Sequence, residues 1–291
     1  MRFSIITPSY NQLAWLELCI ASIADQIPPD GSIHVEHIIQ DGGTPDLDRF
    51  AVNMQARFPN NVNYRLSFYQ EPDHGMYDAL NKAARRATGV IVGHLNCDEQ
   101  YLPGTLSSVC QAFTLSRQVD VICGDMIVLD HAFIPKCYRR SSLPLLGSTG
   151  IVPLQIPTCA LFLHRTLFET GLFYRSDLRA IADSAFVEEL LQRQVQWQFI
   201  RKPLSVFVVH KTNLSSTVAT NEDYRVLFGD TSPDSLLVIS KKSLCWLRKL
   251  FSGAYFFRKI SILVHHPSFP NERQILQTRT VGWRWPRNQI Y

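Results

Sequence analysis

The sequence predicts an α/β protein built on a Rossmann-like, mostly parallel β-sheet flanked by helices. Its first hundred residues alternate short apolar runs with segments whose apolar residues recur at helical spacing. Repeats of this kind form parallel sheets with right-handed crossovers. The apolar runs also end repeatedly in clusters of polar residues and glycine, and ligands of α/β proteins bind at the carboxyl ends of the strands.

The expected elements of this N-terminal third follow one another without interruption. The first strand, Arg2–Pro8, ends in a Pro-Ser-Tyr-Asn turn and precedes a helix over Gln12–Gln26. Further strands are expected over Val35–Gln40, Tyr64–Tyr69 and Val90–Leu95, and further helices over Asp46–Phe58 and Met76–Ala87. Gly89 marks the end of the last of these helices.

The rest of the chain is less regular. We expect a helix over Leu106–Leu115, then one bulged strand or a strand pair over Val119–Leu129, and an edge strand over Phe133–Arg140. Ser141–Pro157 is rich in Gly, Ser and Pro, and its length favours a functional loop or lid. Later elements are a strand leading into a short helix (Cys159–Phe168), an amphipathic helix (Asp183–Gln192), a strand (Trp197–Val209), an irregular polar stretch (Asn213–Asp230) and a basic-aromatic tail (Lys241–Val264).

Composition and charge exclude several classes of protein. With 46% hydrophobic and 19% charged residues among 291, the chain can bury a core and is not disordered. A net charge of +4 is too small to predict nucleic-acid binding. The seven cysteines are scattered without a C-x-x-C pair, which predicts neither a disulfide framework nor a thiolate zinc site. Neither a signal peptide nor a membrane-spanning run is apparent, so we expect a cytoplasmic protein.

The commonest phosphate-binding motifs are absent from the sequence. The first strand is not followed by G-x-G-x-x-G, which disfavours a nicotinamide oxidoreductase, and the chain contains no G-x-x-x-x-G-K-[ST]. An acidic pair, Asp98-Glu99, instead follows the fourth strand. Two carboxylates at a strand end can hold Mg²⁺ or Mn²⁺, which would bridge to diphosphate oxygens. The alternative is a solvated acidic turn.

Four segments, in this order and spacing, resemble the family-2 glycosyltransferases: Thr7-Pro8-Ser9-Tyr10-Asn11, residues 36–46 (EHIIQDGGTPD), residues 71–82 (EPDHGMYDALNK), and residues 87–104 from Ala-Thr-Gly to Asn-Cys-Asp-Glu and Pro-Gly. The resemblance implies a GT-A fold, a nucleotide-sugar donor and transfer with inversion at the anomeric carbon. It further implies a GT-A catalytic domain over residues 1–210, with a nucleotide-sugar half (1–105) and an acceptor and base half (106–210). Residues 211–291 would form a C-terminal helical and irregular appendage.

The resemblance also implies a donor site. Its residues would be Thr7, Pro8, Tyr10, Asp41, Asp73, Asp78, Asn81 and Asp98. Thr7, Pro8 and Tyr10 would form the turn that receives the nucleobase. Asp41 would accept a hydrogen bond from the base, which suits uracil, although an Asp before Gly-Gly can equally serve its own tight turn. Asn81 can instead satisfy backbone groups inside a helix.

Metal and base residues follow from the same comparison. Asp98 and Glu99, with His210 as a late third ligand, would hold Mn²⁺ or Mg²⁺; His210 at a strand end can also be incidental. This chain departs from the family pattern, which usually has Asp at position 99 and Ser at position 97. Asp183 matches the general base, but Ala182 stands where an acidic residue often precedes it. Asp183 can also be a helix N-cap.

The tail contains a segment with two chemically distinct faces. At 100° per residue, Lys241–Ser252 gathers Leu244, Trp246, Leu247, Leu250 and Phe251 on one side and Lys241, Lys242, Arg248 and Lys249 on the other. Such a helix lies in the plane of an anionic membrane, or else packs on the domain with its basic face in solvent.

Taken with the resemblance, the sequence predicts a metal-dependent hexosyl or N-acetylhexosaminyl transferase. It would use a UDP-sugar and act on a hydroxyl of a glycan or a polyprenyl-linked acceptor in surface polysaccharide assembly. The enzyme would be cytoplasmic and peripheral at the inner face of the membrane. The alternative, motivated by Glu99 and Ala182, is a nucleotide-sugar-binding protein that has lost catalysis.

Overall fold

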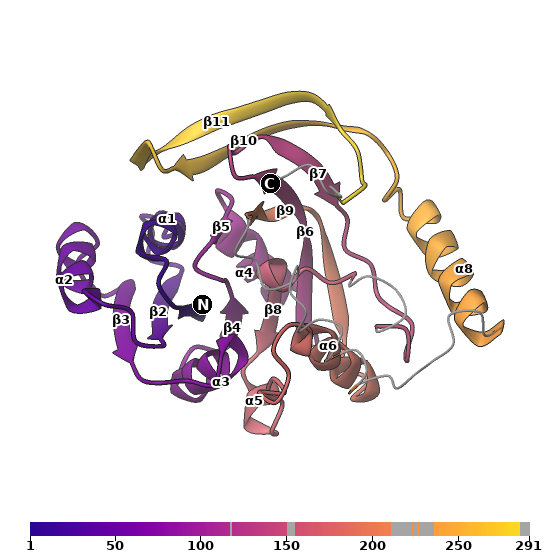
Figure 1. Ribbon diagram of the computed structural model, residues 1–291, viewed down its shortest axis with the longest axis horizontal. Helices are drawn as coiled ribbons and strands as arrows, with labels where there is room; N and C mark the ends of the chain where they lie inside the picture. The colour runs from indigo at the N-terminus through magenta and orange to yellow at the C-terminus, as the bar shows by residue number, and fades with distance from the viewer. Residues whose placement is uncertain (117, 150–154, 211–222, 224–225, 227–235, 286–291) are drawn as a thin grey trace.

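The computed structural model describes all residues except 117, 150–154, 211–222, 224–225, 227–235 and 286–291. It confirms the α/β fold, with helices packed on both sides of a nine-stranded sheet in the order β3-β2-β1-β4-β8-β6-β9-β5, and β7 paired with β6 (Figure 1). The strands are β1 (Arg2–Ser9), β2 (His34–Asp41), β3 (Tyr64–Gln70), β4 (Ile91–His94), β5 (Glu99–Tyr101), β6 (Val121–Asp130), β7 (Pro135–Arg139), β8 (Leu161–His164) and β9 (Trp197–Val209). The helices are α1 (Leu13–Ala24), α2 (Leu47–Arg57), α3 (Met76–Arg86), α4 (Thr105–Leu115), the 3₁₀ turn η1 (Thr158–Ala160), α5 (Thr166–Glu169), α6 (Ala182–Gln192) and α8 (Leu236–Phe251).

The first four strands run parallel, as their strand-helix alternation predicts. β1 pairs with β2 and β4, and β2 pairs with β3, all in parallel. β1 is buried over seven of its eight residues because helices cover both faces, which explains its continuous apolar run. The carboxyl ends of β1, β2 and β4 therefore meet at one edge of the sheet.

Beyond β4 the sheet is mixed. β8 runs antiparallel to both β4 and β6, whereas β6 and β9 are parallel. The segment expected over Val119–Leu129 as a bulged strand or a strand pair forms the single strand β6, whose register against β9 shifts after Gly124. A side chain at Gly124 would overlap Leu204, since an added Cβ would lie 2.3 Å from its side chain. β7 is the expected antiparallel edge strand.

The C-terminal segment contains a β-hairpin that was not predicted from the sequence. Its strands are β10 (Arg258–His266) and β11 (Phe269–Val281). Figure 1 shows the hairpin arching over α1, β5 and β7. Gln100 exchanges two hydrogen bonds of 2.9 Å with the backbone of His265, and Arg273 forms an ion pair with Asp25. Residues 258–281 thus pack on the N-terminal half of the chain.

Two of the expected irregular segments lie partly outside the residues that the structure describes. Asn213–Asp230 lies outside the described residues except for Asp223 and Val226, and the Ser141–Pro157 loop is described on both sides of 150–154. Among the helices that the structure describes, none has the length and apolarity needed to cross a bilayer.

Candidate active site

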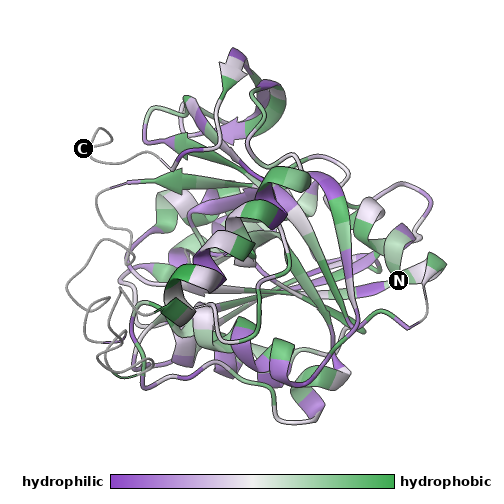
Figure 2. Cartoon of the chain, turned by 90° about the vertical axis from the view of Figure 1, so that its right-hand side faces the viewer, coloured by the Kyte–Doolittle hydropathy of each residue, from purple (hydrophilic) through white to green (hydrophobic). Residues whose placement is uncertain are grey.

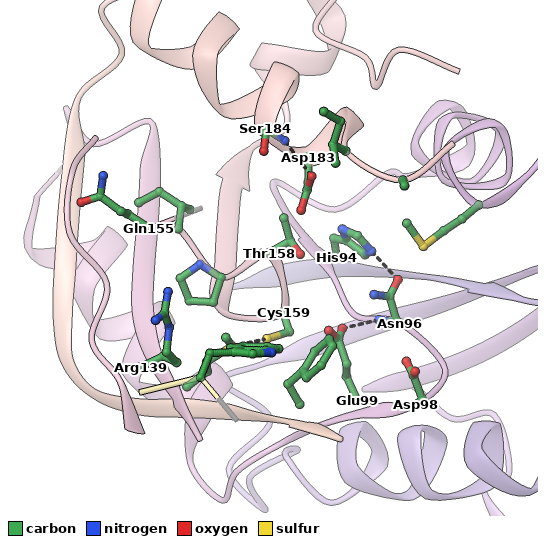
Figure 3. Close-up of a pocket in the computed structure, with 18 of the residues that line it drawn as sticks. His94, Asn96, Asp98, Glu99, Arg139, Gln155, Thr158, Cys159, Asp183 and Ser184 are labelled. Carbon is green, nitrogen blue, oxygen red and sulfur yellow. Dashed lines mark hydrogen bonds between the residues drawn. The ribbon is translucent and has the colours of Figure 1, made fainter. Parts of the chain in front are cut away.

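One large cavity opens at the carboxyl ends of β1 and β4. Its volume is about 1330 Å³, which exceeds the several hundred cubic ångströms of an ordinary ligand pocket. Beyond those strand ends, its walls come from β7, the segment around η1, the start of α6, α8 and the residues that follow β11 (Figure 3). The cavity has room for two substrates at once.

The turn after β1 contributes two of its three predicted residues to this cavity. Pro8 and Tyr10 line it, and Tyr10 is largely exposed. Thr7 is fully buried in the sheet, where its hydroxyl lies 3.0 Å from His37 Nε2. Thr7 therefore supports the turn from inside the core.

Asp41 is buried and bonds its own turn. Its carboxylate accepts hydrogen bonds from the backbone N–H groups of Gly43 (2.9 Å) and Thr44 (2.6 Å) and from the Thr44 hydroxyl (2.7 Å). Asp73 lines the cavity instead, with its carboxylate against Gly42. An added Cβ on Gly42 would lie 2.6 Å from Asp73 Oδ2, so the glycine makes room for this carboxylate.

Asp78 and Asn81 lie on α3 away from the lining of the cavity. Asp78 forms an ion pair with Lys82 and accepts a hydrogen bond from the His74 N–H; these contacts outweigh burial and hold the pKa of Asp78 below its ordinary value. The buried Asn81 amide donates to the Tyr174 carbonyl (2.8 Å) and accepts from the Tyr174 N–H (2.9 Å). Asn81 thus fixes the backbone before α6, which differs from the expected alternative of satisfying backbone groups inside a helix.

Asp98, which lines the cavity, is in direct contact with His210. Asp98 Oδ2 lies 2.7 Å from His210 Nε2, and the imidazole stacks on Trp15 with ring centroids 5.4 Å apart. The two residues are 112 positions apart in sequence, yet the end of β9 and the turn after β4 bring them together. Both side chains are nearly buried.

Glu99 is oriented differently. Its Oε2 accepts a hydrogen bond from the Asn96 N–H at 2.7 Å (Figure 3). Burial first, and then the neighbouring charge of Asp98, raise the pKa of Glu99 well above its ordinary range. A carboxyl with this environment favours the protonated form.

These donors fit a divalent cation in part. Asp98 and His210 offer a carboxylate oxygen and an imidazole nitrogen, but their 2.7 Å contact is a direct hydrogen bond that would have to open to admit an ion. Mg²⁺ commonly takes only one or two protein ligands and completes its shell with water and substrate phosphate. Within the described residues, no group of three His, Cys, Asp or Glu side chains surrounds a common point.

Asp183 lies in the first turn of α6 and points into the cavity (Figure 3). The helix begins at Ala182 with Ile181 at the N-cap position, so Asp183 is not the N-cap. Its Oδ1 accepts a hydrogen bond from the Ser184 N–H at 2.8 Å. Burial raises the pKa of Asp183 to about 6, and this hydrogen bond offsets only part of the increase.

Several residues at the site were not predicted from the sequence. His94 joins the Tyr174 hydroxyl (3.1 Å) to Asn96 (2.8 Å), and Asp223 Oδ2 accepts from three successive N–H groups, at Arg179, Ala180 and Ile181. Asp223 thereby fixes the segment that leads to Asp183. No local motif marks these residues. Basic and aromatic side chains from β7, α8 and the chain after β11 complete the cavity. Neither the edge-strand pattern of β7 nor the sequence of the tail predicts that these segments lie side by side.

The comparison with known protein families agrees with this geometry. The model of glycosyl transferase family 2 matches residues 4–165, more than half of the chain. The chain belongs to glycosyl transferase family 2. The four segments singled out in the sequence all fall within the matched residues, and the family resemblance is confirmed.

Individual relatives match shorter parts. A "PGL/p-HBAD biosynthesis glycosyltransferase" of Mycobacterium bovis is 34% identical over 132 residues, which are 45% of this chain and 49% of the relative. The poly(ribitol-phosphate) β-N-acetylglucosaminyltransferase TarS of Staphylococcus aureus is 23% identical over 189 residues, 64% of this chain and 32% of TarS. The chain therefore spans half or less of the length of these curated relatives.

Solved structures share the fold. A crystal structure of S. aureus TarS 1-349 in complex with UDP-GlcNAc aligns with a TM-score of 0.58 at 17% identity, over 87% of this chain and 73% of that one. A mannosyltransferase from Pyrobaculum calidifontis in complex with GDP-Man and Mn²⁺ aligns with a TM-score of 0.54 at 18% identity, over 73% and 58%. The predicted GT-A fold is thus confirmed.

Proposed function

We propose that the protein is an inverting glycosyltransferase that moves a sugar from a nucleotide donor to a hydroxyl group of an acceptor. The observation that carries this proposal is the large cavity lined by both Asp183 and Asp98, with His210 held 2.7 Å from the Asp98 carboxylate. The acceptor oxygen forms a bond to the anomeric carbon while the bond from that carbon to the diphosphate oxygen breaks. The hydroxyl proton passes to the Asp183 carboxylate, and the electron pair leaves with the diphosphate.

Asp183 suits the role of general base because it is ionised at neutral pH and basic enough to accept a proton. A base works best when its pKa lies near the working pH, and burial brings the pKa of Asp183 to about 6. His94 lies beside it at the cavity wall, but burial lowers the pKa of His94 to about 4, which makes it a weaker proton acceptor (Figure 3).

The donor is proposed to be a UDP-sugar carrying a hexose or N-acetylhexosamine. Pro8 and the exposed Tyr10 line the cavity where the base would bind, and Asp73 adds a carboxylate to the lining. The TarS structure that shares the fold was solved with UDP-GlcNAc, which supports this choice. Asp41, whose carboxylate is engaged by its own turn, would act by fixing the shape of that turn.

Asp98 and His210 would hold Mn²⁺ or Mg²⁺ beside the donor diphosphate. When bound, the ion would neutralise charge on the departing diphosphate. Glu99 is proposed to act on the Asn96 backbone and, through it, on the position of Asp98, since its carboxyl oxygen is already bonded there. The presence of Glu99 in place of the usual Asp would then affect a residue that positions Asp98, and not a direct metal ligand.

The acceptor is proposed to be a glycan or a lipid-linked sugar at the cytoplasmic face of a membrane, in surface polysaccharide assembly. α8 supports this because its apolar face is turned outward. Figure 2 views the molecule from this side, with α8 in front. The exposed apolar side chains are Leu236, Ile239, Leu244, Trp246, Leu247, Leu250 and Phe251, and Phe256 and Phe257 continue the patch. Cys245, on the opposite side of the helix, is buried against Gln155 and Ser148.

We propose that this apolar patch binds an anionic bilayer. The exposed cations Lys242 and Arg248 flank the apolar arc on its two sides, which is the arrangement of an in-plane helix whose basic residues reach the headgroups. Lys241 and Lys249 are turned inward instead: Lys241 donates to the Gly147 carbonyl, and Lys249 lines the cavity. α8 therefore turns its apolar face to solvent and part of its basic face toward the domain, which is the opposite of the alternative in which the basic face is in solvent.

Asp183→Asn tests the function. The amide retains an oxygen that can accept from Ser184, so the fold and the affinity for UDP should be unchanged, while transfer from a UDP-sugar panel falls roughly 10²- to 10⁴-fold. Asp177→Asn is the matched control, since Asp177 is an exposed carboxylate paired with Arg175. UDP binding without any turnover in the unmodified protein would favour the catalytically impaired alternative.

A further inference from the structure

Three basic side chains gather at the end of the cavity that lies away from Asp98. Arg139 is the last residue of β7, Arg140 follows it, and Lys249 projects from the inner side of α8. In Figure 3, Arg139 and Gln155 lie on one side of the cavity and Asp98 and Asn96 on the other, with Asp183 between them. Arg139 and Asp98 therefore lie on opposite sides of the cavity, and Asp183 lies on the wall between these sides.

The charges of Arg140 and Lys249 are only partly compensated within the described residues. Arg140 Nε is buried and has no hydrogen-bond partner among the described residues. Burial first, and then the nearby Arg139, lower the pKa of Lys249 to about 8. Asp125 on β6 bonds Tyr138 (2.7 Å) and Ser141 (2.9 Å), and neither Arg140 nor Lys249 forms a salt bridge within the described part of the chain.

Aromatic rings form the rest of this wall. Tyr255 and Trp283 pack edge to face at 4.5 Å, and Arg139 lies 5.8 Å from the centre of the Trp285 ring. All line the cavity with Tyr138. Arg140 and Lys249 are half-buried, and cations in such a setting favour an anion that accepts charge-assisted hydrogen bonds from them. Flat aromatic faces next to such a site suit sugar rings or an alkyl chain.

We infer that this basic end, formed by Arg139, Arg140 and Lys249, binds a phosphate group of the acceptor. The inference rests on the proposed function. In an inverting displacement the acceptor approaches the anomeric carbon from the side opposite the leaving diphosphate, and Asp183 must touch its hydroxyl. The diphosphate belongs with Asp98, so a phosphate bound on the opposite side of the cavity, at Arg139, belongs to the acceptor. That phosphate can come from a lipid-linked sugar or from a soluble phosphate-bearing glycan.

Direct binding to short probes tests this with the full chain. UDP and Mn²⁺ are first added to saturation, so that no probe occupies the donor site. Calorimetry then compares octyl phosphate, glycerol 1-phosphate and neutral octyl glucoside. Unmodified protein should bind octyl phosphate at least about tenfold more tightly than octyl glucoside, as one charge-assisted hydrogen bond predicts. Arg140→Gln and Lys249→Gln should each lose about tenfold, while affinity for UDP stays the same.

Arg65→Gln and Lys202→Gln, which change exposed cations outside the cavity, are the matched controls and should bind octyl phosphate like the unmodified protein. If Arg140→Gln lowers the melting temperature, the Lys249→Gln variant alone tests the phosphate site. Octyl phosphate binding far more tightly than glycerol 1-phosphate assigns the phosphate to a lipid-linked acceptor, and equal binding assigns it to a soluble one. Equal affinity of octyl phosphate for the Lys249→Gln variant and the unmodified protein, with UDP still bound, overturns the phosphate site but leaves the glycosyltransferase proposal standing.

Discussion

The carboxylate of Asp183 is held at the start of α6, in a wall that contains the stacked rings of Tyr77, Tyr174 and Phe186. Burial in this wall raises the pKa of Asp183 to about 6. The helix N-terminus alone would favour the ionised form and act in the opposite direction. The basicity of this residue is therefore a property of its tertiary surroundings.

The pH dependence of kcat/KM should report this shift. Only ionised Asp183 can accept the proton, so the rate should be level above about pH 6 and fall about tenfold per pH unit below it. An unperturbed Asp would not begin to lose activity until about pH 4. Initial rates between pH 4.5 and 8 measure the profile. A profile that stays level down to pH 4.5 would contradict the buried base.

Stability supplies a second test that does not depend on turnover. A carboxyl whose pKa is raised on folding binds its proton more tightly in the folded state, so its cost to stability is fully present above about pH 6 and disappears below about pH 4. A shift of about two units corresponds to roughly 3 kcal/mol. Asp183→Asn should therefore raise the melting temperature at pH 7 and leave it nearly unchanged at pH 4. A lower melting temperature at pH 7 would indicate a purely structural Asp183.

Residue identities could be predicted from sequence where a strand end puts a side chain into the cavity, as for Pro8, Tyr10, Asp73 and Asp98. The prediction was less informative for Asp41 and Asn81, because both side chains are taken up by backbone groups: Asp41 by its own turn, and Asn81 by Tyr174, which is 93 positions away. Local sequence does not reveal whether a polar side chain meets a ligand or a distant peptide group.

At the scale of elements, α8 separates two environments. Its outer face is apolar and exposed, with Phe251 at 86%, while its inner face contributes Lys249 to the cavity. Helical spacing was sufficient to predict the two faces. It could not predict which face would meet the core, since that depends on a contact between Cys245 and the Gln155 segment. The β10–β11 hairpin was missed because alternation in its outer strand places polar and apolar residues on a largely exposed surface.

Sedimentation with vesicles tests the outer face of α8. The protein should pellet with anionic vesicles at low salt, with each exposed cation contributing on the order of 1 kcal/mol. Lys242→Gln with Arg248→Gln should remove the salt-sensitive part of the binding. Leu250→Ser with Phe251→Ser should remove the part that salt does not screen.

Val62→Ser with Leu115→Ser is the matched control, because both side chains are largely exposed and lie outside α8, Val62 in the loop before β3 and Leu115 at the end of α4. Binding that is indifferent to the α8 changes, or equally weakened by the control, would assign the apolar face to another partner.

At the scale of the whole molecule, the cavity joins the two halves of the sheet and the C-terminal segment. The strand-helix alternation was enough to predict the parallel half, β1 to β4. The mixed half could not be predicted in the same way, because β8 lies between β4 and β6, which precede it in sequence. Trp283 to Trp285 reach the cavity through the contact of β7 with Gly282. The residues expected to form an appendage thus line the site, and the domain boundary near residue 210 stays a prediction.

The proposed division between Asp98 and Glu99 predicts unequal effects of substitution. Chelation should abolish transfer, and Mn²⁺ or Mg²⁺ should restore it. Asp98→Asn should reduce metal-dependent donor binding on the order of 100-fold, since a bound ion supplies several kcal/mol of charge stabilisation. Glu99→Gln should cost far less because its amide oxygen can still accept from Asn96. Full activity in excess chelator would contradict the metal assignment.

The central claim, transfer by direct displacement with Asp183 as base, is tested most directly by the anomeric configuration of the product. An α-linked UDP-sugar that the protein accepts is incubated with acceptor, and the new linkage is assigned from the proton NMR spectrum. The predicted product is the β-anomer, formed by the unmodified protein and lost in Asp183→Asn. A product with retained α-configuration would contradict the mechanism.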